Sequence, residues 1–391
     1  MKKYIRLYNI TLKLSVISTA ICSGILAVLL NDIIESYQLK GTQEGLMSSM
    51  ISIGALTALI TSLLLQGYFR KPRWIVFSGL TAAIALILKG IPMPYFMFLI
   101  MCLIMGFGNG SADSYQSSFL ADLNKEDTPR HMGAMHGIFG IGGVLTPFIF
   151  SKMLKYFYWR TVYIIAGIIC LVFILQFAVI SGYLEKRLSL VSKAEPKFSV
   201  RNFKELFFNR HFVMLLLCIF FSAAAQSGVT VWTIRYVSTY LKSSALSGIC
   251  LSVYWIASTV SRFFSPLIPW KPCKIIAVGA FASAFAWAIA LVVNVPVSIF
   301  IACIIVGLAS GSGIPLSLSE GTSMYGGQTG FATSMLMFFK TVGQILSPII
   351  IAYISYQCQM RVGMLATSVF FAINGLFAVL FLYGFKKQSN S

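Results

Sequence analysis

The chain has 391 residues, of which 58% are hydrophobic and only 10% are charged, and its mean hydropathy is +0.83. A soluble domain carries roughly 25% charged residues, so this composition excludes a soluble protein and indicates an integral membrane protein. The net charge of +19 does not indicate nucleic-acid binding, because the basic residues fall between apolar segments and no polar segment alternates aromatic and basic residues.

Twelve apolar segments are each long enough to cross a bilayer as a helix of about 20 residues. They lie at residues 10–34, 44–66, 74–91, 95–119, 132–152, 161–182, 211–236, 245–265, 274–293, 297–319, 331–354 and 361–384. The first follows a basic start, as in a signal peptide, but no A-x-A-like cleavage site closes it, so we expect it to remain as the first helix. The sequence predicts an all-α integral membrane protein with twelve transmembrane helices.

The basic residues predict how these helices are oriented. With the N-terminus in the cytoplasm, the cytoplasmic connections hold about three basic residues for each one outside, as the positive-inside rule requires. The outer connections and the span ends beside them hold Lys40, Lys89, Lys152, Lys155, Arg160, Lys242 and Arg361. We therefore expect a multi-pass protein of the cell (cytoplasmic) membrane with both termini in the cytoplasm.

One connection, residues 183–210, is longer than the others and is basic. Its second part combines Lys204 with Phe203, Phe207 and Phe208, which favours a short helix lying on the inner leaflet. The preferred interpretation of its role is a simple tether between the two halves that it joins. This cytoplasmic linker divides the chain into an N-terminal six-helix bundle at residues 1–182 and a C-terminal six-helix bundle at residues 211–391.

The second half of the chain repeats features of the first half 201 positions later. The spacing Gly106-x-x-x-Gly110 recurs as Gly307-x-x-x-Gly311, Thr146-Pro147 as Ser347-Pro348, and Arg160 as Arg361. Two pseudo-symmetric bundles in the same orientation resemble the parallel repeat of major facilitator transporters, which bind substrate near the midplane and work by alternating access. The glycine spacing predicts closely packed helices in both halves.

Ionisable residues inside hydrocarbon cost roughly 2.5–3.5 kcal/mol each on insertion scales, so each is a candidate site residue. Lys340 lies near the centre of the eleventh span, where we expect it to contact substrate or a coupling carboxylate, or to form a structural buried pair. Asp113 in the fourth span can load and release a proton in low dielectric, or it can brace the inner helix end. His136 in the fifth span can switch charge near about pH 6.5 or bind a hydroxylated solute; a neutral histidine bonded to a neighbouring helix is the alternative.

The remaining candidates are amides, aromatic residues and charges near span ends. Gln226 and Trp232 give the seventh span a polar and aromatic stripe that suits a sugar ring, although Trp232 also fits an interfacial anchor. Arg235 lies at the outer end of this span, and Asp32 lies near the outer end of the first span, as a gate residue or a solvated helix end. The other candidates are Tyr115, Gln116 and Gln344.

Residues 226–236 of the seventh span resemble the fucose:proton symporter branch of the major facilitator superfamily. That branch shows a glutamine, an aromatic residue and then Ile-Arg-Tyr at similar spacing, matched here by Gln226, Trp232 and Ile234-Arg235-Tyr236. Ser261-Arg262-Phe263 is similar to its Gly-Arg-Phe, and Gln43-Glu44-Gly45-Leu46 to the start of its second helix.

This resemblance implies uptake of a sugar together with protons. The branch's acidic residues in spans one and four fall at Ala27 and Ser111 here, and its glutamine in span five falls at His136. Asp32 and Asp113 lie nearby without being equivalent.

We therefore predict a secondary active transporter that takes up a small polar solute, a sugar, with protons, and that works as a monomer without cofactor or metal. The alternative is a major facilitator exporter of a drug, metabolite or lipid-like compound. Such exporters often carry an arginine within span four and Gly-Pro in span five, whereas here Gly137 is followed by Ile138. An enzyme is not expected, because metal-ligand spacings, a nucleophile elbow and a phosphate loop are absent. A non-transporting sensor would carry a soluble output domain.

Overall fold

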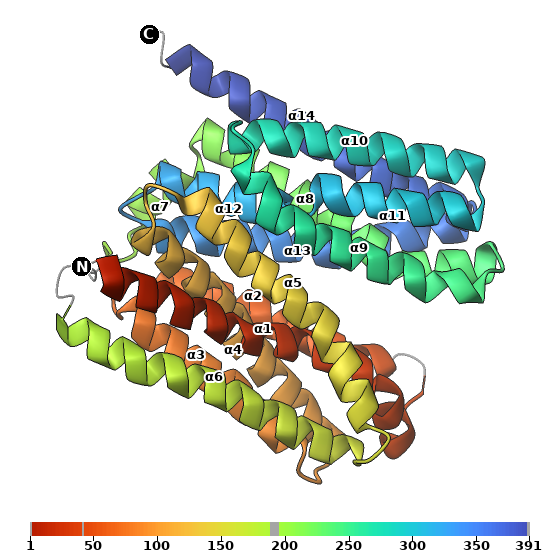
Figure 1. Cartoon of the computed structure of the whole chain (residues 1–391), viewed down its shortest axis with the longest axis horizontal. Helices are drawn as coiled ribbons and strands as arrows, with labels where there is room; N and C mark the ends of the chain where they lie inside the picture. The colour runs from red at the N-terminus through yellow and green to blue at the C-terminus, as the bar shows by residue number, and fades with distance from the viewer. Residues whose placement is uncertain (1, 41–42, 188–194, 389–391) are drawn as a thin grey trace. The chain divides into compact units, whose positions relative to one another are not determined.

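The computed structural model describes residues 2–40, 43–187 and 195–388, and every regular element within these ranges is a helix (Figure 1). The first half consists of α1 (Lys2–Tyr37), α2 (Gln43–Leu64), α3 (Lys71–Lys89), α4 (Tyr95–Leu123), α5 (Thr128–Met153) and α6 (Trp159–Arg187). After α7 (Val200–Phe207) come α8 (Arg210–Arg235), the π-helical turn η1 (Tyr236–Tyr240), α9 (Ser244–Phe264), the 3-10 turn η2 (Ser265–Leu267), α10 (Pro272–Val293), α11 (Pro296–Ser310), α12 (Gly313–Met324), α13 (Thr329–Gln357) and α14 (Met360–Gln388).

Twelve helical segments within the described ranges are long and apolar enough to cross a membrane, as the sequence predicts. Some boundaries differ from expectation, since α1 already begins at Lys2 and α14 ends only at Gln388. The sixth helix continues past residue 182 to Arg187, and the tenth span consists of two helices, α11 and α12, separated by Gly311 and Ser312. Residues 188–194 of the expected linker, including Lys193, lie outside the described residues. The helix expected in the second part of the linker is present as α7.

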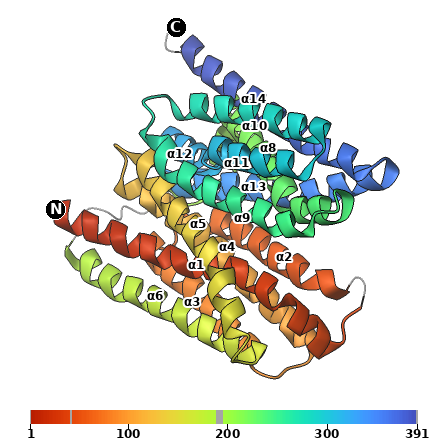
Figure 2. The ribbon, with the colours of Figure 1, turned by 45° about the vertical axis from the view of Figure 1, so that its right-hand side comes forward.

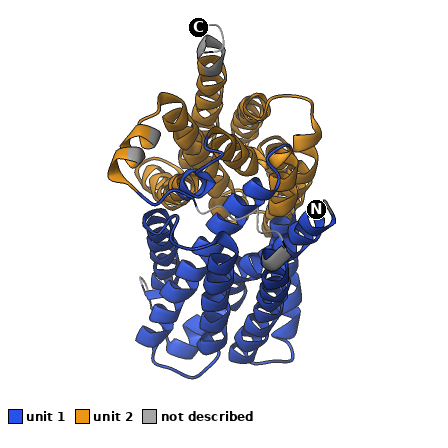
Figure 3. Cartoon of the chain, turned by 90° about the vertical axis from the view of Figure 1, so that its left-hand side faces the viewer, with its two compact units in different colours: residues 1–126, 138–198, 325–334 blue, residues 127–137, 199–324, 335–391 orange. Residues whose placement is uncertain are grey.

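The chain groups into two compact units (Figure 3). The first contains residues 1–126, 138–198 and 325–334. Within it α4 packs against α2 and α3, and α6 packs against α1 and α3 (Figure 2). Gly106 and Gly110 allow the close approach of α4 to α2, since a Cβ atom at these positions would meet the backbone of Ile51 and Ala55.

The second unit contains residues 127–137, 199–324 and 335–391. Its packing repeats that of the first, because α11 packs against α9 and α10, and α14 packs against α8 and α10. Gly307 and Gly311 face Tyr254 and Ser258 of α9. Both GxxxG spacings therefore serve the close helix contact that the sequence predicts.

Proline occurs both at the starts of helices and inside two helices, where it interrupts the backbone hydrogen bonds. Pro72, Pro272 and Pro296 lie in the first turns of α3, α10 and α11, where a helix needs no N–H donor. Pro147 and Pro348 lie inside α5 and α13. Each leaves the carbonyl four residues earlier without its helical hydrogen bond, and a membrane-spanning helix must find that carbonyl another donor.

Lys89 forms the last residue of α3, within the span expected at residues 74–91, and it is completely buried. Its Nζ atom lies 4.9 Å from the ring centroid of Phe98 and 4.4 Å from that of Tyr163. Aromatic faces attract a cation electrostatically, so these rings replace part of the hydration that the lysine has lost.

Candidate functional site

The ten candidate site residues are divided between the two units. Asp32, Asp113, Tyr115 and Gln116 belong to the first unit, and His136, Gln226, Trp232, Arg235, Lys340 and Gln344 belong to the second. The geometry of each group is described within its own unit.

In the first unit, polar side chains line the contact between α1 and α4. The Nδ2 atom of Asn109 donates to Ser23 Oγ at 3.0 Å, and Nε2 of Gln116 donates to Ser15 Oγ at 3.0 Å. Asp113 lies between Asn109 and Gln116 at spacings of four and three residues, which places all three on one helix face. We name these five residues the α1–α4 seam.

The seam retains hydrogen-bonding capacity. The Oδ1 atom of Asn109 and the Oε1 atom of Gln116 are both covered from solvent, and neither has a hydrogen-bond partner within the described ranges. A buried acceptor without a donor costs free energy, and most such groups in proteins are paired. In a conformation that exposes them, these two carbonyl oxygens can accept hydrogen bonds from a hydroxylated molecule without giving up any bond within the described part of the protein.

The other two candidates of this unit do not join the seam. Tyr115 is buried on another face of α4, where its hydroxyl donates to the carbonyl oxygen of Ser62 at 3.3 Å and its ring packs against Trp74. Asp32 is half-buried on α1, nine positions beyond Ser23. The structure thus brings together Asp113 and Gln116 and separates both from Tyr115 and Asp32.

In the second unit, Gln226 bridges the break in the tenth span. The carbonyls at the end of a helix lack intrahelical donors, and here two side chains supply them. Gln226 Nε2 donates to the Ser310 carbonyl at 3.2 Å, and Arg262 Nε donates to the Gly311 carbonyl at 3.2 Å. Discontinuous transmembrane helices form binding sites in several transporter folds, so the break is a candidate part of a site.

Arg262 also connects this break to His136. Its Nη1 atom donates to the His136 carbonyl oxygen at 3.2 Å, and its guanidinium lies 5.9 Å from the centroid of Trp255. Both Arg262 and His136 are buried, with 6% and 8% of their surfaces exposed. In the sequence Arg262 stands out only as part of the family resemblance, whereas the structure places it between the Gly311 carbonyl and the backbone of His136 on α5.

Lys340 and Gln344 lie on one face of α13, four residues apart. Lys340 is half-buried and Gln344 is exposed. Pro348 leaves the Gln344 carbonyl without its helical donor, and the hydroxyl of Ser227 on α8 supplies one at 2.9 Å. The polar stripe of α8 therefore holds the interrupted turn of α13 directly beyond Lys340.

Trp232 and Arg235 lie one turn apart near the end of α8. The guanidinium of the exposed Arg235 is 5.7 Å from the centroid of the Trp232 ring, a cation–π distance. The indole Nε1 atom of Trp232 is covered and has no hydrogen-bond partner within the described residues. Its N–H is available to an acceptor.

A charged cluster absent from the candidates holds the first turn of α13. Thr329 Oγ1 donates to Asp122 Oδ1 at 2.7 Å, and the Gly330 N–H donates to Glu195 Oε1 at 2.9 Å. Lys71 Nζ pairs with Asp122 at 2.6 Å and with Glu195 at 2.5 Å. We name Lys71, Asp122, Glu195 and Thr329 the α13 anchor; all four belong to the first unit.

Two features of the site were not among the candidates, the serines of α1 in the α1–α4 seam and the α13 anchor. The sequence signals for them differ in strength. Ser15, Thr19 and Ser23 recur every four residues in an otherwise apolar span, which indicates a polar face on α1. The α13 anchor joins residues 51 to 258 positions apart along the chain. Its members look like ordinary solvated loop charges until the fold brings them together.

Several known proteins are similar to this chain. A crystal structure of the transporter FucP in the outward conformation matches it with a TM-score of 0.80 and 15% identity, over 97% of this chain and 99% of that one. A crystal structure of a variant of the E. coli fucose:proton symporter FucP matches with a TM-score of 0.74 and 14% identity over the same shares. The human organic anion transporter MFSD10 (TETRAN) matches with a TM-score of 0.76 and 14% identity, over 96% of this chain and 99% of that one.

These low identities establish a common fold only, and a search by sequence among curated proteins finds no match. The fold class predicted from the sequence, with twelve transmembrane helices, is confirmed. The model of the Major Facilitator Superfamily matches residues 12–347. Because this match covers most of the 391 residues, the chain belongs to the Major Facilitator Superfamily of transporters.

Proposed function

We propose that this transporter takes up a sugar or a similar polar solute together with protons, by alternating access. The α1–α4 seam carries the proposal. It provides two covered amide oxygens without donors and one half-buried carboxylate on a single helix face. Amide and hydroxyl groups suit a solute rich in hydroxyls, and Asp113 supplies a group that can carry a proton.

The similarity in fold to FucP also supports proton-coupled sugar uptake. Two of the similar structures are of FucP, one of them named as a fucose:proton symporter. In the second unit the break at Gly311 and the face of α13 with Lys340 offer further polar groups. We assign these groups, with Gln226 and Trp232, to solute binding or coupling.

The division of two helices between the units supports alternating access. Residues 128–137 of α5 group with the second unit, and residues 329–334 of α13 group with the first (Figure 3). Thr128 and Thr329, which begin these helices, lie 201 positions apart and are therefore related by the repeat. In this proposal, movement of one unit against the other bends these helices or releases their first turns, and release at α13 requires the contacts of the α13 anchor to open.

The test is accumulation of labelled monosaccharides in proteoliposomes, with and without an inward proton gradient. Gradient-driven accumulation of one sugar, abolished by an ionophore that dissipates the gradient, is the expected result. Uptake of that sugar at an equal level without the gradient would refute proton coupling. Failure of every sugar, in protein that elutes as a folded species, would refute sugar uptake.

An organic anion is the second candidate solute. The half-buried cation Lys340 within α13 favours it, and one similar structure is of an organic anion transporter. A panel of labelled organic acids in the same proteoliposomes distinguishes the two. Accumulation of an organic acid that Lys340→Gln abolishes would favour the anion, whereas accumulation of a neutral sugar would favour the first proposal.

A further inference from the structure

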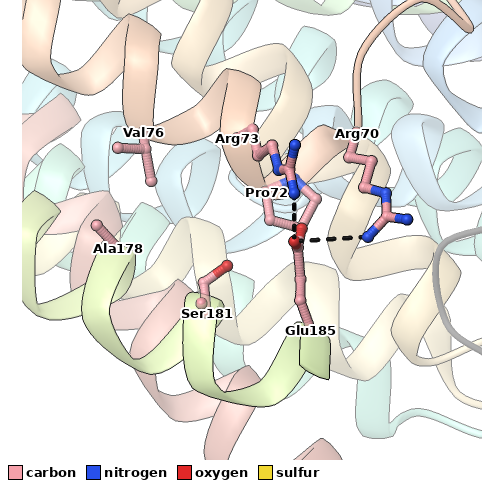
Figure 4. Close-up of a pocket in the computed structure, with 8 residues that line it drawn as sticks. Arg70, Pro72, Arg73, Val76, Ala178, Ser181 and Glu185 are labelled. Atoms are coloured by element: carbon pink, nitrogen blue, oxygen red, sulfur yellow. Dashed lines mark hydrogen bonds and ion pairs between the residues drawn. The ribbon is translucent and has the colours of Figure 1, made fainter. Parts of the chain in front are cut away.

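A pocket of about 490 Å³ lies between α3 and α6 of the first unit, apart from the seam and the α13 anchor (Figure 4). Arg70, Arg73 and Glu185 lie at one end of it, and Val76 and Ala178 lie at the other (Figure 4). The pocket therefore has a charged end and an apolar end.

The charged end coincides with the ends of two membrane spans. One span begins at Lys71 and the other ends at Glu185, so the arginines flank the boundary between apolar and polar surroundings. Val76 and Ala178 lie further inside their spans. Large apolar side chains beside them, Phe77 and Val179, are 53% and 72% exposed, as expected for residues that face acyl chains.

Glu185 uses only some of the N–H donors of the two arginines. Their guanidinium groups lie 3.6 and 3.5 Å from the same oxygen, Oε2, and their side chains are 50% and 72% exposed. A guanidinium has five N–H donors, so most donors of this pair are open to another acceptor. The first turn of α3 adds the partial positive charge of a helix N-terminus.

Gly182 leaves open space at the wall of the pocket. A Cβ atom at this position would meet no atom within 4 Å, so close helix packing does not require glycine here. At Gly79 and Gly167, by contrast, a Cβ atom would collide with the neighbouring helix. Glycine inside a helix costs about 1 kcal/mol relative to alanine, and its effect at residue 182 is to keep the pocket open.

We propose that this pocket binds the phosphate head group of an anionic phospholipid. Arg70 and Arg73 contact the phosphate, the space beside Gly182 holds the glycerol region, and the acyl chains leave along Val76 and Ala178. Basic pockets between transmembrane helices are a recognised way of holding anionic head groups. Bidentate guanidinium–phosphate contacts supply the specificity. The predicted orientation places the site in the inner leaflet.

The test measures binding of phosphatidylglycerol, fluorescently labelled on an acyl chain, to the purified protein in neutral detergent. We expect binding about tenfold tighter than that of phosphatidylcholine with the same label, since only the former presents a net negative head group. The Arg70→Gln/Arg73→Gln variant removes the charged end, and Gly182→Leu fills the pocket while improving the helix propensity of α6. Each is expected to lower the affinity by about tenfold.

Two matched controls accompany these variants. Arg130→Gln removes an exposed arginine outside the pocket, and Gly248→Leu replaces another glycine that has no neighbour within 4 Å. Both are expected to bind phosphatidylglycerol as the unaltered protein does. Equal affinity for the two lipids, or full affinity in Gly182→Leu, would overturn the proposal. Displacement of the lipid by millimolar inorganic phosphate would assign the site to a soluble phosphate instead.

Discussion

Arg160, at the start of α6, donates a hydrogen bond from Nη1 to the carbonyl oxygen of Ile91 at 3.0 Å. Arg361, at the start of α14, donates from Nη2 to the carbonyl oxygen of Val292 at 2.7 Å. Positions 91 and 292 differ by 201, as do positions 160 and 361. The internal repeat therefore preserves donors together with their acceptors, which are backbone carbonyls at the C-terminal ends of α3 and α10.

The same repeat preserves the close contacts of glycine. Gly106→Ala and Gly307→Ala are each expected to destabilise the protein by about 1–3 kcal/mol, because a new methyl group would overlap the neighbouring helix. Thermal unfolding in detergent measures the effect, and Gly248→Ala is the control because its Cβ atom has free space. Unfolding temperatures that do not change in either glycine variant would contradict this account of the packing.

Asp113→Asn is expected to remove proton-driven accumulation of the solute while sparing exchange of solute across the membrane. The amide keeps the size of the side chain but cannot take up or release a proton as a carboxyl group does. Uptake is measured over a range of pH, with Glu126→Gln as a control that removes an exposed carboxylate. A pH dependence equal to that of the unaltered protein would exclude Asp113 as the coupling group.

Lys340→Ala is expected to abolish or uncouple transport without preventing membrane insertion. The residue is half-buried within a transmembrane helix, and a charge kept there at a cost of a few kcal/mol indicates a role. Initial uptake rates and the amount of folded protein are compared with those of Lys125→Ala, which removes an exposed lysine. Normal uptake by the Lys340 variant would remove this residue from the site.

Glu195→Gln is expected to release the first turns of α13. Glu195 binds both Lys71 and the Gly330 N–H, and loss of one partner from a largely covered, hydrogen-bonded charge pair is strongly unfavourable. Thr333, which is fully buried, reports the opening when replaced by cysteine. The background is Cys358→Ser, because the other seven cysteines are buried.

Alkylation of Thr333→Cys by a water-soluble maleimide is expected to rise about tenfold when Glu195 is changed to Gln. Glu205→Gln is the control, since Glu205 forms an exposed ion pair with Arg201 on α7. Equal alkylation rates in the three proteins would mean that the α13 anchor does not restrain this segment.

The sequence identifies individual polar residues of the site, but not the partners that they meet on other helices. Asp113 and Gln116 stand out because polar groups in a lipid-facing span are costly, and their helical spacing places them on one face. Their partners Ser15 and Ser23 belong to another helix. Tyr115 and Gln116 are both candidates by sequence, although adjacent residues on a helix point in directions about 100° apart.

By itself the sequence determined the membrane class, the number of spans and the repeat, because the bilayer requires long apolar segments whose backbone groups bond within each helix. It also carried the family resemblance in the seventh span. Only the tertiary structure decided which side chains meet: Gln226 and Arg262 at the break of span ten, Ser227 at the carbonyl freed by Pro348, and the four residues of the α13 anchor. These contacts depend on how neighbouring helices pack, and hydropathy along one chain carries no information about the partner that each polar group finds.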